Sequence, residues 1–236
     1  AERLKAGLRY VIVNLVGSTL FLFAIGLLYG VTGTLNMADL AVRIRELPEA
    51  DQGIAQAGGL LLLAVFGLKA ALLPLHLWLP RAYAGTSPAV AALFAVMTKV
   101  GAYAIIRVFA LVFGPDAGPM ALLGQSWLLP AALLTTLVGF VGVVAGRTLR
   151  DMAAFAVIGS TGILLTAVAG LGEATLAAAL YYLPHTTLAG ATMFLVADLV
   201  IHRRGEWQDR LEPGPRFPDM GITGAMFLLA AIAAAG

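Results

Sequence analysis

Residues 54–80 read "IAQAGGLLLLAVFGLKAALLPLHLWLP", an apolar stretch that contains one lysine, one histidine and two prolines. The stretch is longer than the roughly 20 residues that an α-helix needs to cross a bilayer. Pro74 and Pro80 follow closely after Lys69, and a proline inside a helix removes one backbone donor and clashes with the preceding turn. The sequence therefore predicts a membrane helix that is broken near 69–80.

Similar apolar runs fill the rest of the chain, which is 60% hydrophobic and only 12% charged, against about 25% charged residues in soluble domains. Lipid leaves every backbone donor and acceptor to be satisfied within the spanning segment, so runs of this length are expected to be helices. We predict an all-α, polytopic transmembrane helix bundle. The runs cover about 10–31, 54–80, 88–113, 127–146, 152–171 and 175–201, and another begins near 219.

Both ends of the sequence suggest a piece of a longer chain. The first residues, "AERLKAGLRY", contain no initiator methionine, and the last run is still apolar at Gly236. The sequence has no cysteine, which removes disulfides and thiolate metal sites from consideration. We expect no metal and no cofactor.

The basic residues predict how the helices are oriented. If the spans alternate, ten of the fifteen Lys and Arg residues fall on the side of the N-terminus and two, Arg43 and Arg45, on the other. Basic residues are enriched on the cytoplasmic side of membrane proteins, so the side of the N-terminus is expected to be cytoplasmic. The basic residues form no continuous stripe, which argues against binding of nucleic acid. The segment 36–51 is expected to be an amphipathic surface helix on the opposite side, with Asp39 in its first turn. The ten residues are Arg3, Lys5, Arg9, Arg81, Arg147, Arg150, Arg203, Arg204, Arg210 and Arg216.

Lys69 and Lys99 both lie deep within apolar runs. A lysine at the centre of a membrane helix costs about 2.5 to 3.5 kcal/mol on insertion scales, so such residues usually face a bundle interior or a water-filled path. Desolvation disfavours the charged form and makes a lysine able to exchange a proton. The alternative is that each lysine only fixes helix packing. Because two such lysines occur in successive helices, we favour a role of both in a proton relay.

Four further polar residues within or near the runs could also take part in a proton relay. His76 lies within the predicted break, and breaks at membrane depth are tolerated where they line a hydrated cavity. His185, beside Thr187, lies about ten residues inside the run 175–201. Either histidine fits a proton relay or a structural hydrogen bond. Arg107 fits an interfacial position or a counter-charge within the path.

Acidic residues near the ends of the runs are interpreted as interfacial. Asp198 stands four residues before His202, which predicts an ion pair at the membrane surface. Asp151 directly follows Arg150, and we predict that these two residues pair at the start of a helix.

Three stretches resemble a known family. "KAALLPLHLWLP" (69–80), "TKVGAYAIIR" (98–107) and "RTLRDMAAFAVIGSTGILL" (147–165) are similar to successive helices of the antiporter-like membrane subunits. That family includes the large hydrophobic subunits of respiratory complex I and subunits of multisubunit cation/proton antiporters. The sequence is most similar to the D subunits of Mrp-type (Pha or Mnh) antiporters.

The resemblance implies a fold of fourteen helices with two inverted repeats. Residues 1–113 would end the first repeat, and residues 127–236 would form most of the second. Lys69 then corresponds to the lysine of the broken seventh helix, Lys99 to the lysine of the eighth, and His185 to the histidine of the eleventh. The family's glutamate on the fifth helix would precede Ala1, and its lysine on the twelfth would follow Gly236.

One position departs from the family pattern. Many relatives carry a lysine shortly after the histidine of the eleventh helix, whereas this chain reads "PHTTLAGATMF" (184–194). A relay through that position would need water, Thr187 or His185.

From the resemblance we expect a proton-translocating subunit of a multisubunit Na+ or K+/proton antiporter, a transporter rather than an enzyme. Its partners would be other membrane subunits, in the inner (plasma) membrane of a bacterium. The alternative is a proton-pumping membrane subunit of complex I or of a related membrane-bound hydrogenase. A third possibility is a scaffold subunit without transport, against which the two buried lysines argue.

Overall fold

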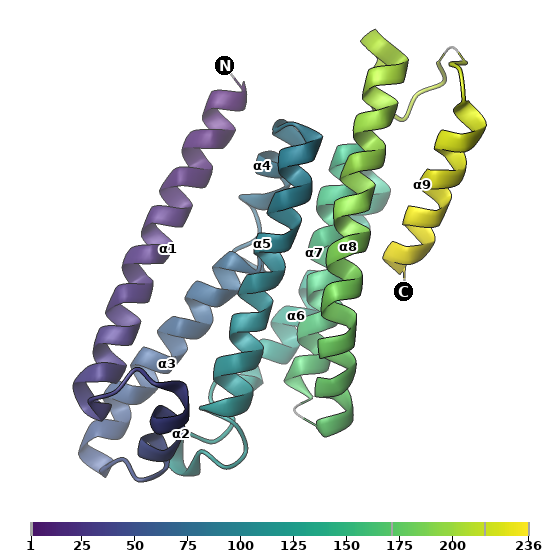
Figure 1. The fold of residues 1–236 in the computed structure, drawn as a ribbon. Helices are drawn as coiled ribbons and strands as arrows, with labels where there is room; N and C mark the ends of the chain where they lie inside the picture. Colours follow the sequence, from purple (N-terminus) through teal and green to yellow (C-terminus); the bar gives the residue numbers. More distant parts are fainter. Residues whose placement is uncertain (1, 171, 215, 236) are drawn as a thin grey trace.

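The computed structural model describes residues 2–170, 172–214 and 216–235, and within them every regular element is a helix (Figure 1). In this part of the chain, six helices are long and apolar enough to cross a membrane, which confirms the predicted all-α bundle. The ends of two predicted runs, residues 171 and 236, and the side chains of Arg3 and Lys5 lie outside the described part.

The helices follow the predicted runs closely. The elements are α1 (Glu2–Thr32), α2 (Met37–Arg45), α3 (Glu49–Lys69), α4 (Leu79–Gly85), α5 (Pro88–Ile105) with a π-helical continuation η1 (Ile106–Ala110), η2 (Gly118–Met120), α6 (Gln125–Ala145), α7 (Leu149–Ala169), α8 (Glu173–Arg204), η3 (Gly205–Trp207) and α9 (Met220–Ala235). The apolar run 54–80 is divided between α3 and α4, so the predicted break is confirmed.

Successive long helices run in opposite directions, and their connections gather at the two ends of the bundle (Figure 1). At one end, the α6–α7 and α8–α9 connections meet in an antiparallel bridge between Thr148 and Arg210. At the other end, α2 packs against η2. The bundle therefore has the alternation from which the sidedness of the basic residues was predicted.

The surface helix α2 is shorter than the predicted segment 36–51. It ends at Arg45, and residues 49–51 already belong to the first turn of α3. Pro48 separates the two helices, because proline disfavours a helical conformation in the residue before it. The helix is amphipathic as expected and buries Leu40 and Ile44 against the bundle, with Asp39 in its first turn.

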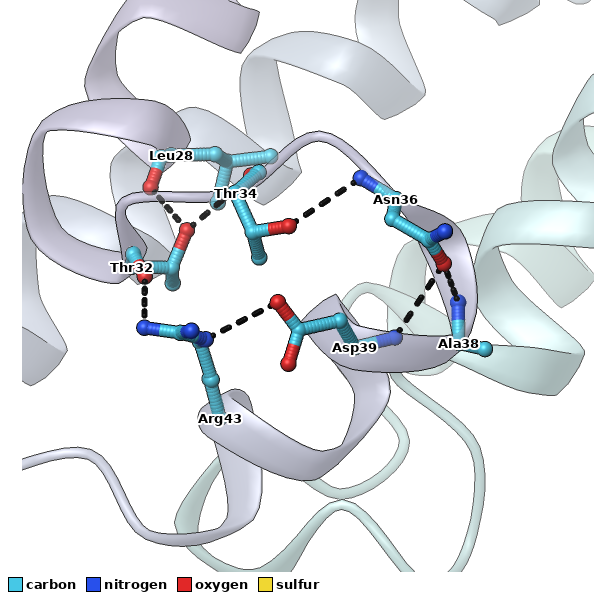
Figure 2. A network of polar contacts seen from close by, with 7 residues as sticks. All are labelled: Leu28, Thr32, Thr34, Asn36, Ala38, Asp39 and Arg43. Atoms are coloured by element: carbon cyan, nitrogen blue, oxygen red, sulfur yellow. Dashed lines mark hydrogen bonds and ion pairs between the residues drawn. The ribbon is translucent and has the colours of Figure 1, made fainter.

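A polar network ties α2 to the end of α1 (Figure 2). The Asn36 side chain caps α2 by accepting from the backbone N–H of Ala38 at 3.0 Å. Arg43 donates from Nε to Asp39 Oδ2 and from Nη1 to the carbonyl of Thr32, each at 3.0 Å. The arginine thereby satisfies a terminal carbonyl of α1, which no intrahelical partner would satisfy.

The contact between α2 and the end of α1, here called the α1–α2 corner, should become less stable at acidic pH. The hydrogen bond from Arg43, followed by one from Thr34, holds the pKa of the Asp39 carboxyl below its usual value. The pair therefore stabilises the corner above the pKa of an unfolded aspartate, about 4, and this contribution is lost as the pH falls through the lower pKa of the folded state. We expect amide hydrogen exchange in residues 32–45, corrected for intrinsic rates, to accelerate below about pH 4. Asp39→Asn should abolish this pH dependence, and a flat wild-type profile would contradict the assignment.

The α8–α9 connection is fastened to the start of α7 by a buried ion pair. The Asp209 side chain is fully buried and accepts from Arg150 Nε at 2.9 Å, Nη2 at 3.0 Å and backbone N–H at 3.0 Å. The prediction that Arg150 pairs with Asp151 is therefore wrong. Adjacent residues on a helix do not face each other, and Asp151 instead lies in the first turn of α7, where its N–H donates to the Thr148 hydroxyl. The predicted pair of Asp198 with His202 is present, at 3.5 Å on the surface of α8.

Removing Asp209 should destabilise the protein strongly. Asp209→Ala leaves the largely buried Arg150 guanidinium without its counter-charge, and breaking a buried pair in this way costs about 3–5 kcal/mol. Thermal denaturation of the purified protein in detergent measures the effect. Glu206→Ala is the control, because Glu206 is an exposed acid of the same connection. Equal stability of the two variants would show that the ion pair does not hold the connection.

Candidate functional site

The candidate site begins where α3 ends. Lys69 is the last residue of α3, and the chain is non-helical from there to the start of α4 at Leu79. Pro74 lies in this interrupted segment, and Pro80 lies in the first turn of α4, where a proline is tolerated because its missing N–H would have no intrahelical partner. The interruption leaves backbone groups that need other partners at membrane depth.

Neighbouring elements satisfy several of these groups. The N–H of Leu73 donates to the hydroxyl of Thr135 in α6 at 2.9 Å, and Trp78 Nε1 donates to the carbonyl of Leu68 at 3.0 Å. Helix α5 passes directly against the break at Gly101. A Cβ atom there would lie 2.7 Å from the backbone nitrogen of Ala70, so only glycine fits. The break is thus held between α5 and α6.

Lys69 is half-buried, and its ammonium points to α1. Its Nζ donates to Oδ1 of Asn14 at 2.5 Å. The C-terminal end of a helix carries a partial negative charge that favours a nearby cation, and Lys69 occupies the last turn of α3. The amide oxygen of Asn14 therefore holds this ammonium, and the position of Lys69 in the last turn of α3 favours a positive charge.

Lys99 lies in the interior of the bundle, with a relative exposure of 2%. Its Nζ donates to the Ser160 hydroxyl at 2.8 Å and to the Thr161 hydroxyl at 3.0 Å, both on α7. These hydroxyls in turn donate to the carbonyl of Val157. Lys99 is therefore buried among neutral hydrogen-bond acceptors.

Neither lysine has an acidic partner within the described residues. The ion pairs found there have Arg43, Arg150, His202 and Arg203 as their basic members. In the same part of the chain, no group of three or more His, Cys, Asp or Glu residues could hold a metal ion.

The structure places His185 against α9. Its Nε2 lies 2.7 Å from the carbonyl of Ala233 in α9, and it lines an apolar groove of about 550 Å³ between α8 and α9. Lys99 instead contacts α7, and the hydrogen bonds of the described residues include none between Lys99 and His185. The Thr187 hydroxyl donates within its own helix, to the carbonyl of Leu183.

The remaining candidates lie at the edges of the site. His76 lies in the interrupted segment, and its Nδ1 atom is buried without a protein hydrogen-bond partner. Arg107 is exposed in the π-helical continuation of α5.

Aromatic side chains surround the break on the side of α1 and α4. The ring of Tyr10 stacks on Phe94 with centroids 5.3 Å apart and lies 5.7 Å from Trp78. Tyr10 and Phe94 also line a cavity of about 290 Å³ with Ser87 and Thr86, at the end of the bundle that contains α4. This cavity brings polar groups and open volume to the turn of α1 that precedes Asn14.

Sequence reasoning missed Asn14, Ser160 and Thr161. Each of them is a polar residue inside an apolar run, and this could have marked it as a candidate partner of a lysine. Nothing within one run shows which polar residue will face a lysine from another helix.

Comparison with known proteins identifies the family of the chain. Residues 1–236 match the family described as NADH:quinone oxidoreductase/Mrp antiporter, transmembrane. A relative from Rhizobium meliloti, named as the D subunit of a probable K+/H+ antiporter, is 42% identical over 99% of this chain and 47% of the relative. A second relative, from Bacillus subtilis and named as the D subunit of a Na+/H+ antiporter, is 39% identical over 99% of this chain and 46% of the relative.

A solved structure shows the same fold. A chain of the Mrp complex from Dietzia sp. DQ12-45-1b superposes with a TM-score of 0.83 at 31% identity, over 99% of this chain and 42% of that one. The present chain thus spans about half the length of the curated relatives it matches. The chain belongs to the NADH:quinone oxidoreductase/Mrp antiporter family of membrane proteins.

Proposed function

We propose that this chain forms part of the proton-translocating core of a multisubunit antiporter that exchanges protons for Na+ or K+. The observation that carries the proposal is Lys99, an amine buried in the bundle without a carboxylate partner among the described residues. Such a position disfavours a permanent charge. The amine can therefore accept and release a proton more readily than a lysine in a salt bridge.

In this proposal Lys69, Lys99 and His185 are successive proton carriers. Lys69 lies at the break, Lys99 in the interior and His185 beside the α8–α9 groove. These groups have different hydrogen-bond partners, so water would have to connect them. The Nδ1 atom of His76, buried without a protein hydrogen-bond partner, is a further polar group in the interrupted segment.

The relatives' names support an antiporter more than a redox-driven pump. Both curated relatives described above are named as components of cation/proton antiporters. One is named for K+ and the other for Na+, and the proposal accordingly includes both cations. Other membrane subunits would complete the complex in a bacterial plasma membrane, with the α4 end of the bundle in the cytoplasm. We also propose that residues 1–113 end the first inverted repeat and that residues 127–236 form most of the second.

Replacing Lys99 tests the relay directly. Lys99→Met keeps most of the length of the side chain but removes the amine, and Lys99→Arg keeps a charge that cannot release its proton. We expect both variants to lower cation/proton exchange by about a hundredfold or more, the usual contribution of a positioned proton-transfer group. Exchange is measured in everted membrane vesicles at matched amounts of assembled complex. Wild-type exchange in Lys99→Arg would exclude Lys99 as a proton carrier.

The role of His185 is tested with a substitution that keeps its hydrogen bond but cannot take up a proton. His185→Gln offers an N–H to the carbonyl of Ala233 but cannot carry a proton in the physiological range. We expect the same vesicle assay to show a loss of exchange in this variant. His202→Gln is the matched control, because His202 is an exposed histidine at the end of the same helix. Full activity in His185→Gln would assign His185 a structural role.

A further inference from the structure

Asn14 is a polar residue in the apolar helix α1, whose neighbouring side chains Leu15 and Val16 are exposed on the outside of the bundle. Its own side chain is half-buried and turned toward α3. An amide in this position needs partners for both its oxygen and its nitrogen, because burial without hydrogen bonds is unfavourable.

Both ends of the Asn14 amide have a partner. Oδ1 accepts from Lys69 Nζ at 2.5 Å, and Nδ2 donates to the carbonyl of Tyr10, one turn earlier in α1, at 2.9 Å. The bond to Tyr10 fixes which end of the amide faces the lysine. Asn14 can therefore offer Lys69 an acceptor and no donor.

Helix packing brings Asn14 within reach of the break. Gly17 lies on the same face of α1 three residues further on, and a Cβ atom there would lie 2.9 Å from Leu68 Cδ2 and 3.8 Å from Lys69 Cε. Residues three apart on a helix are neighbours on its surface. The space left at Gly17 therefore lets the last turn of α3 approach the turn of α1 that contains Asn14.

We propose that Asn14 is a positioning residue that holds the amine of Lys69 at the break of α3 as its neutral hydrogen-bond acceptor. This inference rests on the proposed role of Lys69 as a proton carrier. When the ammonium gives one proton to water, the remaining amine still has two N–H groups, so Asn14 Oδ1 can accept from either form. A carboxylate would instead favour the charged form. Asn14 thus fixes the position of Lys69 without trapping its proton.

Two substitutions separate this role from simple packing. Asn14→Leu has nearly the same shape but no acceptor, whereas Asn14→Gln is larger and keeps the amide. We expect Asn14→Leu to lower the maximal exchange rate about tenfold or more, because misplacement of a reacting group by about 1 Å can cost a hundredfold. Asn14→Gln should lose clearly less of the rate, because its longer and flexible side chain can still present an amide oxygen to the lysine. The cation concentration at half-maximal exchange should not change in either variant, since the cation does not contact Asn14 in this proposal.

The assay uses the full-length subunit assembled with its partners, at matched amounts in everted vesicles. Thr19→Val is the control, because it removes an exposed side-chain hydrogen bond of the same helix and should leave exchange unchanged. Wild-type exchange in Asn14→Leu, or an equal loss in Asn14→Leu and Asn14→Gln, overturns the proposal and leaves a packing role. Wild-type exchange in Lys69→Met would instead refute the relay role of Lys69 itself.

Discussion

The ammonium of Lys99 inside the helix bundle is the constraint on which the site depends. In a membrane interior, a cation without acceptors is unstable, and one bound to a carboxylate would be held in its charged form. The structure provides the hydroxyls of Ser160 and Thr161, which are themselves fixed by the carbonyl of Val157. Lys69 is held in a comparable way by Asn14. Among the described residues, two lysines in successive membrane helices thus have neutral partners.

The interrupted helix makes this arrangement possible. Because α3 stops at Lys69, the lysine lies at a helix end, where carbonyl groups favour a cation. The close approach of α5 at Gly101 and the bond from Leu73 to Thr135 stabilise the break on two sides. The same α5 contains Lys99 two residues before Gly101, so a single helix both supports the break and contributes the second lysine.

Sequence alone predicted the helices and the break, because bilayer thickness sets the length of a span and proline interrupts the helical hydrogen bonds. It also placed Lys69 and Lys99 within the membrane. It did not identify Asn14, Ser160 or Thr161, since contacts between helices depend on how the helices rotate and approach each other. For the same reason Arg150 was assigned to its neighbour Asp151, although its partner Asp209 lies 59 residues further along the chain. Surface helix α2 ends earlier than expected because Pro48 separates it from α3, which begins at Glu49.

The central claim, that Lys99 gains and loses a proton, is tested most directly by nitrogen-15 NMR of lysine side chains in the assembled, reconstituted complex. The difference between the wild-type spectrum and a spectrum of Lys99→Met identifies the signal of Lys99. Ammonium and neutral amine nitrogens have separate resonances. The account predicts that the Lys99 signal converts between the two forms within the pH range in which the complex exchanges cations for protons. A Lys99 signal that stays in the ammonium form throughout that range would contradict it.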